Sequence, residues 1–123
     1  MSNQTVLVVE DDRWLAQQYS KILEKAGFRA IVTSHALSAI DAVDSVPPDA
    51  IVLDVLLAGS TAFPLLHELQ SYEDTGSIPI ILCTNLAADI VLDDVEPYGV
   101  KRILDKAVMT PGDLVAAVKG VIE

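Results

Sequence analysis

The stretch DAIVLDVLLAG, residues 49–59, is the part of the sequence that decides the fold. Its segment AIVLD (50–54) is apolar up to the final aspartate, which is typical of a central parallel strand covered on both faces. No lysine or arginine lies nearby in the sequence to neutralise Asp54. An ionised carboxylate beside a core is costly unless it is solvated, paired or bound to a metal. Asp54 therefore lies either at a solvated strand end or in a site that uses its charge.

Similar apolar runs alternate with amphipathic segments along the rest of the chain. Five strands alternating with five helices through short loops predict an α/β fold, a doubly wound parallel sheet with helices on both faces. The last strand is the most polar, so we expect it at an edge of the sheet. We expect residues 1–123 to form a single domain. The predicted strands are 5–10, 28–34, 50–54, 78–84 and 100–105, and the predicted helices are 11–27, 35–46, 62–72, 87–96 and 110–122, the fourth of them short and weak.

Two of these helices carry informative local patterns. In the second helix Leu37, Ile40 and Val43 follow one another at near-helical spacing and form an apolar stripe. The last helix begins with Thr110 as its cap, Pro111 at its first position and an acidic residue three positions after the cap. The sequence therefore predicts a capped amphipathic helix at the end of the fold.

The composition excludes several classes of protein. The net charge of −10 would repel phosphates, so no direct contact with nucleic acid is expected. No apolar run approaches the roughly 20 residues of a membrane span, and no signal peptide is recognisable, so no membrane insertion is expected. The single cysteine, Cys83, cannot form an intrachain disulfide and fits a reducing cytoplasm. The acidic balance fits a metal site or a basic protein partner, and solubility alone explains it equally well.

Polar side chains gather at the predicted carboxyl ends of the strands. In an open parallel sheet ligands bind beyond these ends, near the point where the strand order reverses. One aspartate at a solvated strand end is more often structural than functional, and Asp12 is most simply the cap of the first helix. The combination is more informative, because these strands are otherwise apolar. The residues that would meet there are Glu10, Asp11, Asp54, Thr84 and Lys106.

Such a cluster has a specific chemistry. Two carboxylates about 4 Å apart repel each other by roughly 4 kcal/mol at an effective dielectric constant near 20. Oxygen ligands without histidine or cysteine favour Mg²⁺, which accepts phosphate oxygens as well. A divalent ion, a lysine and a hydroxyl group are the parts needed to neutralise a phosphoryl group in transfer. Asp54 could then be the nucleophile, since carboxylates form aspartyl phosphates.

The motifs VVEDD (8–12), IVLD (51–54), ILCT (81–84) and ILDK (103–106) together resemble those of a response-regulator receiver domain of two-component signalling. Their separations match the usual spacing of that family over essentially the whole chain. The resemblance implies a flavodoxin-like sheet with strand order 2-1-3-4-5. It also implies a signalling domain that catalyses only its own Mg²⁺-dependent phosphorylation and dephosphorylation.

The resemblance assigns roles by position. Asp54 would accept phosphate from a phosphohistidine on a sensor histidine kinase or a histidine phosphotransfer protein. Lys106 would pair with Asp54 and then with the phosphate, while Thr84 would move to hydrogen-bond it and change the surface seen by a downstream protein target. The implied Mg²⁺ ligands are Asp11, Asp54, Glu10 acting through water, and the backbone carbonyl of Leu56.

Several positions depart from the family pattern. Ala107 follows Lys106 where a cis proline is usual, and a cis bond before alanine costs about 2.5–4 kcal/mol. Ile103 stands where many members carry a switching aromatic residue, and Asn85 is larger than the usual Ala or Gly. These departures keep open an alternative, a phosphorylation-independent pseudo-receiver that acts as an interaction module.

Two other classes fit the residues less well. EDDRW (10–14) would repel the phosphate of a flavin, and Leu56 stands where aspartyl-phosphate phosphatases place a second acid. Three further side chains are expected outside the site. His35 and His67 are expected at the surface and Cys83 in the core, whereas Trp14 is either a partner contact or a partly covered surface aromatic residue.

Overall fold

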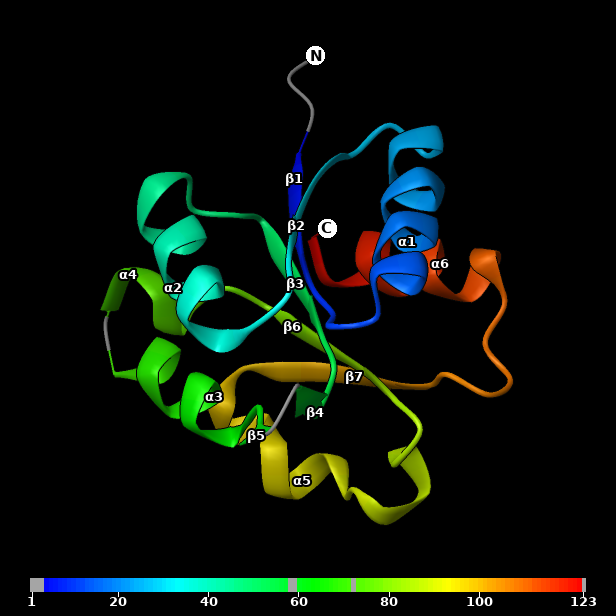
Figure 1. Ribbon diagram of the computed structural model, residues 1–123. Helices are drawn as coiled ribbons and strands as arrows, with labels where there is room; N and C mark the ends of the chain where they lie inside the picture. Colours follow the sequence, from blue (N-terminus) through cyan, green and yellow to red (C-terminus); the bar gives the residue numbers. More distant parts are fainter. Residues whose placement is uncertain (1–3, 58–59, 72, 123) are drawn as a thin grey trace.

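A five-stranded parallel sheet forms the centre of the molecule (Figure 1). The computed structural model describes residues 4–57, 60–71 and 73–122. The strand order is β2-β1-β3-β6-β7, which confirms the expected order 2-1-3-4-5 and places the polar last strand at an edge. The strands are β1 (Thr5–Val9), β2 (Arg29–Thr33), β3 (Ala50–Leu53), β6 (Ile80–Thr84) and β7 (Val100–Asp105).

Helices cover both faces of this sheet. In Figure 1, α1 and α6 lie on one side of the sheet and α2 and α3 on the other. The short strands β4 (Leu56–Leu57) and β5 (Ser60–Thr61) form a separate antiparallel pair after β3. The helices are α1 (Arg13–Lys25), α2 (Ala36–Ser45), α3 (Phe63–Gln70), α4 (Glu73–Gly76), η1 (Ala87–Asp89), α5 (Leu92–Val95), η2 (Glu96–Tyr98) and α6 (Pro111–Ile122).

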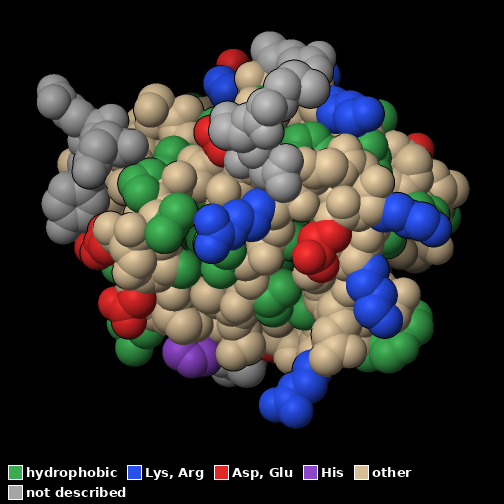
Figure 2. Space-filling model, turned by 90° about the horizontal axis from the view of Figure 1, so that it is seen from above, with side chains coloured by type: hydrophobic (Ala, Val, Ile, Leu, Met, Phe, Trp, Pro, Cys, Tyr) green, Lys and Arg blue, Asp and Glu red, His purple; other side chains and the backbone are tan. Residues whose placement is uncertain are grey.

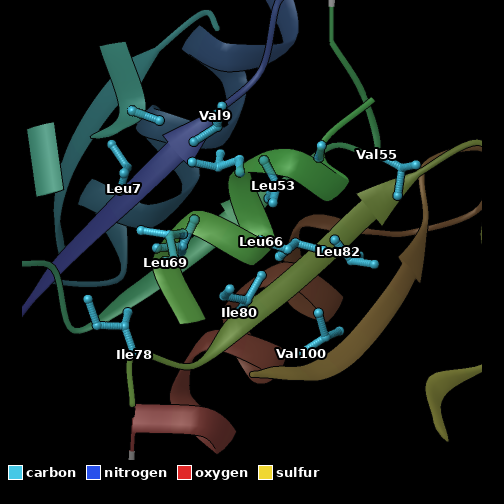
Figure 3. Close-up of a cluster of buried hydrophobic side chains, with 14 of the residues drawn as sticks. Leu7, Val9, Leu53, Val55, Leu66, Leu69, Ile78, Ile80, Leu82 and Val100 are labelled. Atoms are coloured by element: carbon cyan, nitrogen blue, oxygen red, sulfur yellow. The ribbon is translucent and has the colours of Figure 1, made fainter. Parts of the chain in front are cut away.

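Burial follows from this layering. Every residue of β1, β3 and β6 is buried, because helices cover both faces of these central strands. The core has two parts, one on each face. The first contains Leu7, Leu53, Leu66, Leu82 and Val100 among others (Figure 3), and the second contains residues of α1 and α6 with the opposite faces of the same strands. The two layers hold the strand ends in fixed positions.

Local signals at the helix ends are confirmed. The Asp12 side chain caps α1 by accepting a hydrogen bond of 3.1 Å from the backbone N–H of Leu15. At α6, the Thr110 N–H donates to the Asp113 carboxylate at 2.8 Å and the Asp113 N–H donates to the Thr110 hydroxyl at 3.1 Å. This reciprocal pair is a capping box, with Pro111 at the first helical position.

The structure differs from the helix predictions in three details. Leu37, expected on the buried stripe of α2, is 73% exposed, whereas Ala39 and Val43 are buried. Leu37 lies two residues before Ala39, about 200° around the helix, and therefore points away from the sheet. The helix expected over 87–96 is broken into η1, α5 and η2. The helix expected over 62–72 ends at Gln70, and residue 72 lies outside the described residues.

Candidate functional site

The predicted site residues converge at the carboxyl ends of the strands. They line a cavity of about 460 Å³ that opens at this edge of the sheet. Its lining consists of Glu10, Asp11, Asp12, Leu15, Asp54, Thr84, Asn85 and Lys106. The expectation that three carboxylates, a hydroxyl and an ammonium group meet at one edge is therefore confirmed.

Backbone hydrogen bonds continue past the strand ends and position these side chains. The N–H of Glu10 donates to the carbonyl of Thr33 at 3.0 Å, and the N–H of Asp54 donates to the carbonyl of Val9 at 3.3 Å. The N–H of Lys106 donates to the carbonyl of Thr84 at 3.1 Å. Glu10, Asp54 and Lys106 are thus held by the neighbouring strand in the same way as strand residues.

Lys106 is the cation at the centre of the acidic cluster. Its Nζ lies 2.6 Å from Oδ2 of Asp54 and also forms an ion pair with Oε1 of Glu10. The Lys106 and Asp54 side chains are each 9% exposed, and that of Glu10 is 2% exposed. Buried charges need partners of opposite sign, and this ammonium group supplies one to both carboxylates.

Burial and pairing act in opposite directions on these groups. Burial raises the pKa of the Glu10 carboxyl, and the hydrogen bonds from Lys106 and from the Asp12 N–H only partly offset it. Burial by itself would lower the pKa of Lys106, but the hydrogen bonds to Asp54 and Glu10 and the charges of these groups raise it above its ordinary value. Lys106 therefore remains an ammonium ion at neutral pH.

The carboxylates of Glu10, Asp11 and Asp54 form a set of oxygen donors suited to a divalent cation. One oxygen from each lies within 4.8 Å of the others. Asp11 is exposed while the other two are buried, so the cluster is open to solvent on one side. Hard oxygen donors without nitrogen or sulfur fit Mg²⁺ better than a transition metal. Leu56, the expected source of a backbone carbonyl ligand, is the first residue of β4, two positions after Asp54.

Thr84 and Asn85 occupy different positions at this edge. Thr84 is 1% exposed, and its hydroxyl accepts a hydrogen bond of 3.1 Å from the Leu86 N–H. Asn85 is exposed and lines the cavity, whereas Leu86 packs against the core. An exposed amide, and not an apolar side chain, therefore borders the cavity after Thr84.

The loop after β7 has an ordinary backbone. The structure contains no cis peptide bond within the described ranges, so the bond between Lys106 and Ala107 is trans. The Ala107 N–H donates to the Asp105 carboxylate at 2.9 Å, which fixes this turn without a proline. Ile103 is half-buried and packs against the core formed with α2 and α3.

Leu15 is a member of the site that was not predicted from the sequence. Leu15 forms an apolar part of the cavity wall while also packing against the core. Its place on the apolar stripe of α1 indicates only burial. Its position in the first turn of α1, three residues after the cap Asp12, is the signal that places it beside the carboxylates.

The remaining singled-out residues lie outside the cavity lining. Trp14 is 66% exposed in the first turn of α1. His35 is exposed and caps α2, and His67 is exposed with its ring against that of Tyr98, so the surface placement of both histidines is confirmed. Cys83 is 1% exposed, as expected of a core residue.

The fold and the site define a doubly wound α/β protein with an acidic, lysine-containing site at the switch point of its sheet. The chain matches the model of the response regulator receiver domain over residues 6–119 and belongs to that family. It is therefore a receiver domain of the kind used in two-component signalling. Along the part of the chain that the structure describes, no helix is long and apolar enough to cross a membrane.

Curated relatives are regulators of greater length. The probable transcriptional regulatory protein TcrX of Mycobacterium tuberculosis is 39% identical over 89 residues, which cover 72% of this chain and 36% of TcrX. The sensory transduction protein RegX3 of the same species is 30% identical over 121 residues, covering 96% of this chain and 50% of RegX3. The chain thus spans half or less of the length of these two relatives.

Solved structures share the whole fold. A putative response regulator from Chloroflexus aurantiacus is 26% identical with a TM-score of 0.85, and the match covers 98% of each chain. The receiver domain of the sensor histidine kinase PA1611 from Pseudomonas aeruginosa has a TM-score of 0.86 at 21% identity, again over 98% of each chain. That structure holds a magnesium ion in its active-site cleft.

Proposed function

We propose that this receiver domain is phosphorylated on Asp54 by a phosphohistidine of a sensor histidine kinase or a histidine phosphotransfer protein. The phosphoryl group then changes how the domain binds a downstream protein. One observation carries the proposal. In a single cavity, the Lys106 ammonium contacts the buried carboxylate of Asp54. One oxygen of this carboxylate lies within 4.8 Å of an oxygen of Glu10 and of an oxygen of Asp11.

Mg²⁺ is the cofactor that this donor set fits. Asp11 and Asp54 would bind it directly, Glu10 through water, and Leu56 through its backbone carbonyl. When bound, the ion would neutralise negative charge on the phosphoryl oxygens. The cluster of Glu10, Asp11 and Asp54 and the magnesium held by the P. aeruginosa receiver support this assignment.

The chemical step is a transfer of one phosphoryl group. A carboxylate oxygen of Asp54 forms a bond to phosphorus while the bond between phosphorus and the donor imidazole nitrogen breaks. The imidazole leaves with the electron pair of that bond and takes up a proton. Lys106, already 2.6 Å from Asp54, holds the attacking carboxylate and then the phosphoryl oxygens. The Thr84 hydroxyl, which accepts from the Leu86 N–H, moves to donate its own proton to a phosphoryl oxygen.

The alternative, a pseudo-receiver without phosphorylation, is not favoured. The departures at Asn85, Ile103 and Ala107 leave every expected functional side chain in the cavity. The turn after Lys106 is fixed by Asp105, so the absence of a proline does not displace the lysine from Asp54. What changes is the route from the site to the surface, because Ile103 cannot rotate as an aromatic ring does.

The setting of the domain follows from the same features. We propose that residues 1–123 act as one receiver domain in the cytoplasm. The relatives named as transcriptional regulators have sequence beyond the region that this chain matches. With a net charge of −10, the present chain is proposed to bind protein partners and not DNA.

The experiment is the intact mass after incubation with acetyl phosphate, with and without Mg²⁺. We expect a Mg²⁺-dependent gain of one phosphoryl group in the wild type and none in Asp54→Asn. Asp12→Asn is the matched control, because it removes one charge from the same cavity wall while asparagine still caps α1. It should be phosphorylated. If the wild type gains no mass under any donor, the pseudo-receiver is the better description.

A further inference from the structure

Among the residues that the structure describes, no strand pairs with the outer side of the edge strand β2. A groove of about 1010 Å³ runs beside it, between α1 and the start of α2, and Val32 of β2 lines this groove with 43% of its surface exposed. All five residues of β2 are at least partly exposed, unlike those of β1, β3 and β6. The outer edge of β2 is therefore accessible to another chain.

The backbone of β2 presents a symmetric set of hydrogen-bonding groups at this edge. The backbone groups of Arg29 and Thr33 face β1. The Arg29 N–H donates to the Gln4 carbonyl, and the Thr33 carbonyl accepts from the Glu10 N–H. Because backbone groups alternate along a strand, those of Ala30 and Val32 point away from the sheet. These two residues flank Ile31 at equal distances. In an antiparallel pair of β2 strands centred on Ile31, Ala30 of each chain would lie opposite Val32 of the other chain. In each of these two pairs, both residues would donate and accept one backbone hydrogen bond.

The two edges of the sheet differ in how they are protected. β7, the opposite edge, carries two adjacent exposed cations, Lys101 and Arg102, and its pairing with β6 has a register shift between Ile80 and Ile81. Charges and irregularities of this kind keep an edge from pairing with another chain. β2 has a regular register with β1 over all five residues, and its one charge, on Arg29, is at its first position.

Charge favours the antiparallel arrangement over the parallel one. Lys25 in the last turn of α1 and Arg29 lie at the amino end of β2, and Figure 2 shows Lys and Arg side chains spread over that end of the molecule. Asp11 and Glu10 line the other end of the groove, next to the last residues of β2, and Arg13, Lys21 and Glu24 of α1 line it as well. An antiparallel copy brings the basic end of one chain to the acidic end of the other. It also places Arg29 of the second copy opposite Thr33, the last residue of β2.

We propose that two copies of this chain associate through their β2 strands, paired antiparallel about Ile31, so that one sheet continues across both. The proposal does not depend on phosphorylation of Asp54. An interface built on one short strand falls in the small, transient class, with a dissociation constant on the order of 100 µM.

Sedimentation equilibrium and amide hydrogen exchange over a concentration series test the association. At about 1 mM protein roughly a fifth of the chain would remain monomeric, so exchange at Ala30 and Val32 should slow about fivefold relative to dilute protein. Val32→Pro removes an outward N–H that β1 does not use and should abolish the dimer. Val32→Thr keeps the N–H and the β-branch and should retain it. A monomer at every concentration, or a dimer that Val32→Pro leaves intact, would overturn the proposal.

A cross-linking experiment tests the register independently of the proline variant. In a Cys83→Ala background, Ile31→Cys places two thiols directly opposite each other at a non-hydrogen-bonded pair, where the Cα atoms are about 4.5 Å apart. Oxidation should give a disulfide-linked dimer. Arg29→Cys is the control, since its copies would lie about 13 Å apart and beyond disulfide reach. Equal cross-linking of both variants, or none at residue 31, would contradict the proposed pairing.

Discussion

At the carboxyl edge of the sheet, the Lys106 ammonium contacts two buried carboxylates, those of Glu10 and Asp54. Lys106→Met keeps the length of the side chain and removes its charge. Because the two carboxylates are left without their cation, we expect a loss of about 3 kcal/mol in the free energy of unfolding at pH 7. A divalent cation bound by the same carboxylates would restore stability, so Mg²⁺ should recover much of the loss.

Urea denaturation with and without millimolar Mg²⁺ measures this effect. Lys101→Met, which changes an exposed lysine of β7, is the matched control and should change stability little. Equal losses in the two variants would contradict the assigned role of Lys106. So would a loss at Lys106→Met that Mg²⁺ does not reduce.

The buried thiol of Cys83 should make the free energy of unfolding depend on pH. Burial raises the pKa of this thiol from 9.0 to about 11, with the Tyr19 hydroxyl 3.5 Å away. As the pH rises, the thiol loses its proton in the unfolded chain before it does so in the folded chain. The contribution of the thiol to the free energy of unfolding is therefore complete below pH 9 and is lost as the pH rises through 11. Over this range the free energy of unfolding should fall by up to about 3 kcal/mol.

Cys83→Ala removes this contribution, so its stability should fall less steeply above pH 9 than that of the wild type. Denaturant unfolding at pH 8, 9 and 10 makes the comparison. If the free energy of unfolding falls with pH at the same slope in the two proteins, the thiol has the same pKa in the folded and unfolded chains. That result would contradict a raised pKa of Cys83 in the folded protein.

The identity of the site residues could be predicted from the sequence, and the resemblance to receivers implied the pair of Lys106 with Asp54, but the other contacts could not be predicted. Glu10, Asp54 and Lys106 stand at strand ends, and strand ends of a parallel sheet meet at one edge. The second ion pair of Lys106, to Glu10, depends on side-chain conformations that no motif encodes. The bond from Leu86 to the Thr84 hydroxyl likewise depends on the loop after β6.

The helix α6 is the element whose start the sequence specifies most completely. Thr110 and Asp113 satisfy each other's backbone N–H groups in the structure. Thr110→Ala removes the hydroxyl acceptor and should lower the free energy of unfolding by about 1 kcal/mol. Thr110→Ser keeps the acceptor and should cost much less. Thermal unfolding of the two variants decides this, and equal losses would contradict the capping role.

The segment between β6 and β7 shows where local patterns fail. Its spacing of apolar residues indicates one helix, but Ile90 and Val91 adopt extended backbone angles and separate η1 from α5. Both residues are β-branched, which lowers their helix propensity. The exposed Leu37 has a different cause, because α2 turns Ala39 and Val43 toward the sheet and the sequence does not fix that rotation.

For the whole molecule, the order of the elements could be predicted because each buried strand is an apolar run bounded by turn residues. Right-handed crossovers and the two covered faces then restrict the arrangement of the strands. The order 2-1-3-4-5 came from the resemblance to receivers and is confirmed. This order already places β2 at an edge, but the exposure of its side chains could not be predicted, since its sequence is that of any half-buried strand.

The central claim is that one carboxylate, among the 18 acidic side chains of the chain, is phosphorylated. The most direct measurement treats the Mg²⁺- and acetyl phosphate-incubated protein with hydroxylamine, which converts an acyl phosphate into a hydroxamate, and locates the product by tandem mass spectrometry. We expect a hydroxamate at Asp54 alone, and none when Mg²⁺ is omitted. A hydroxamate at Glu10 or Asp11, or phosphate on His35 or His67 with Asp54 unmodified, would contradict the account.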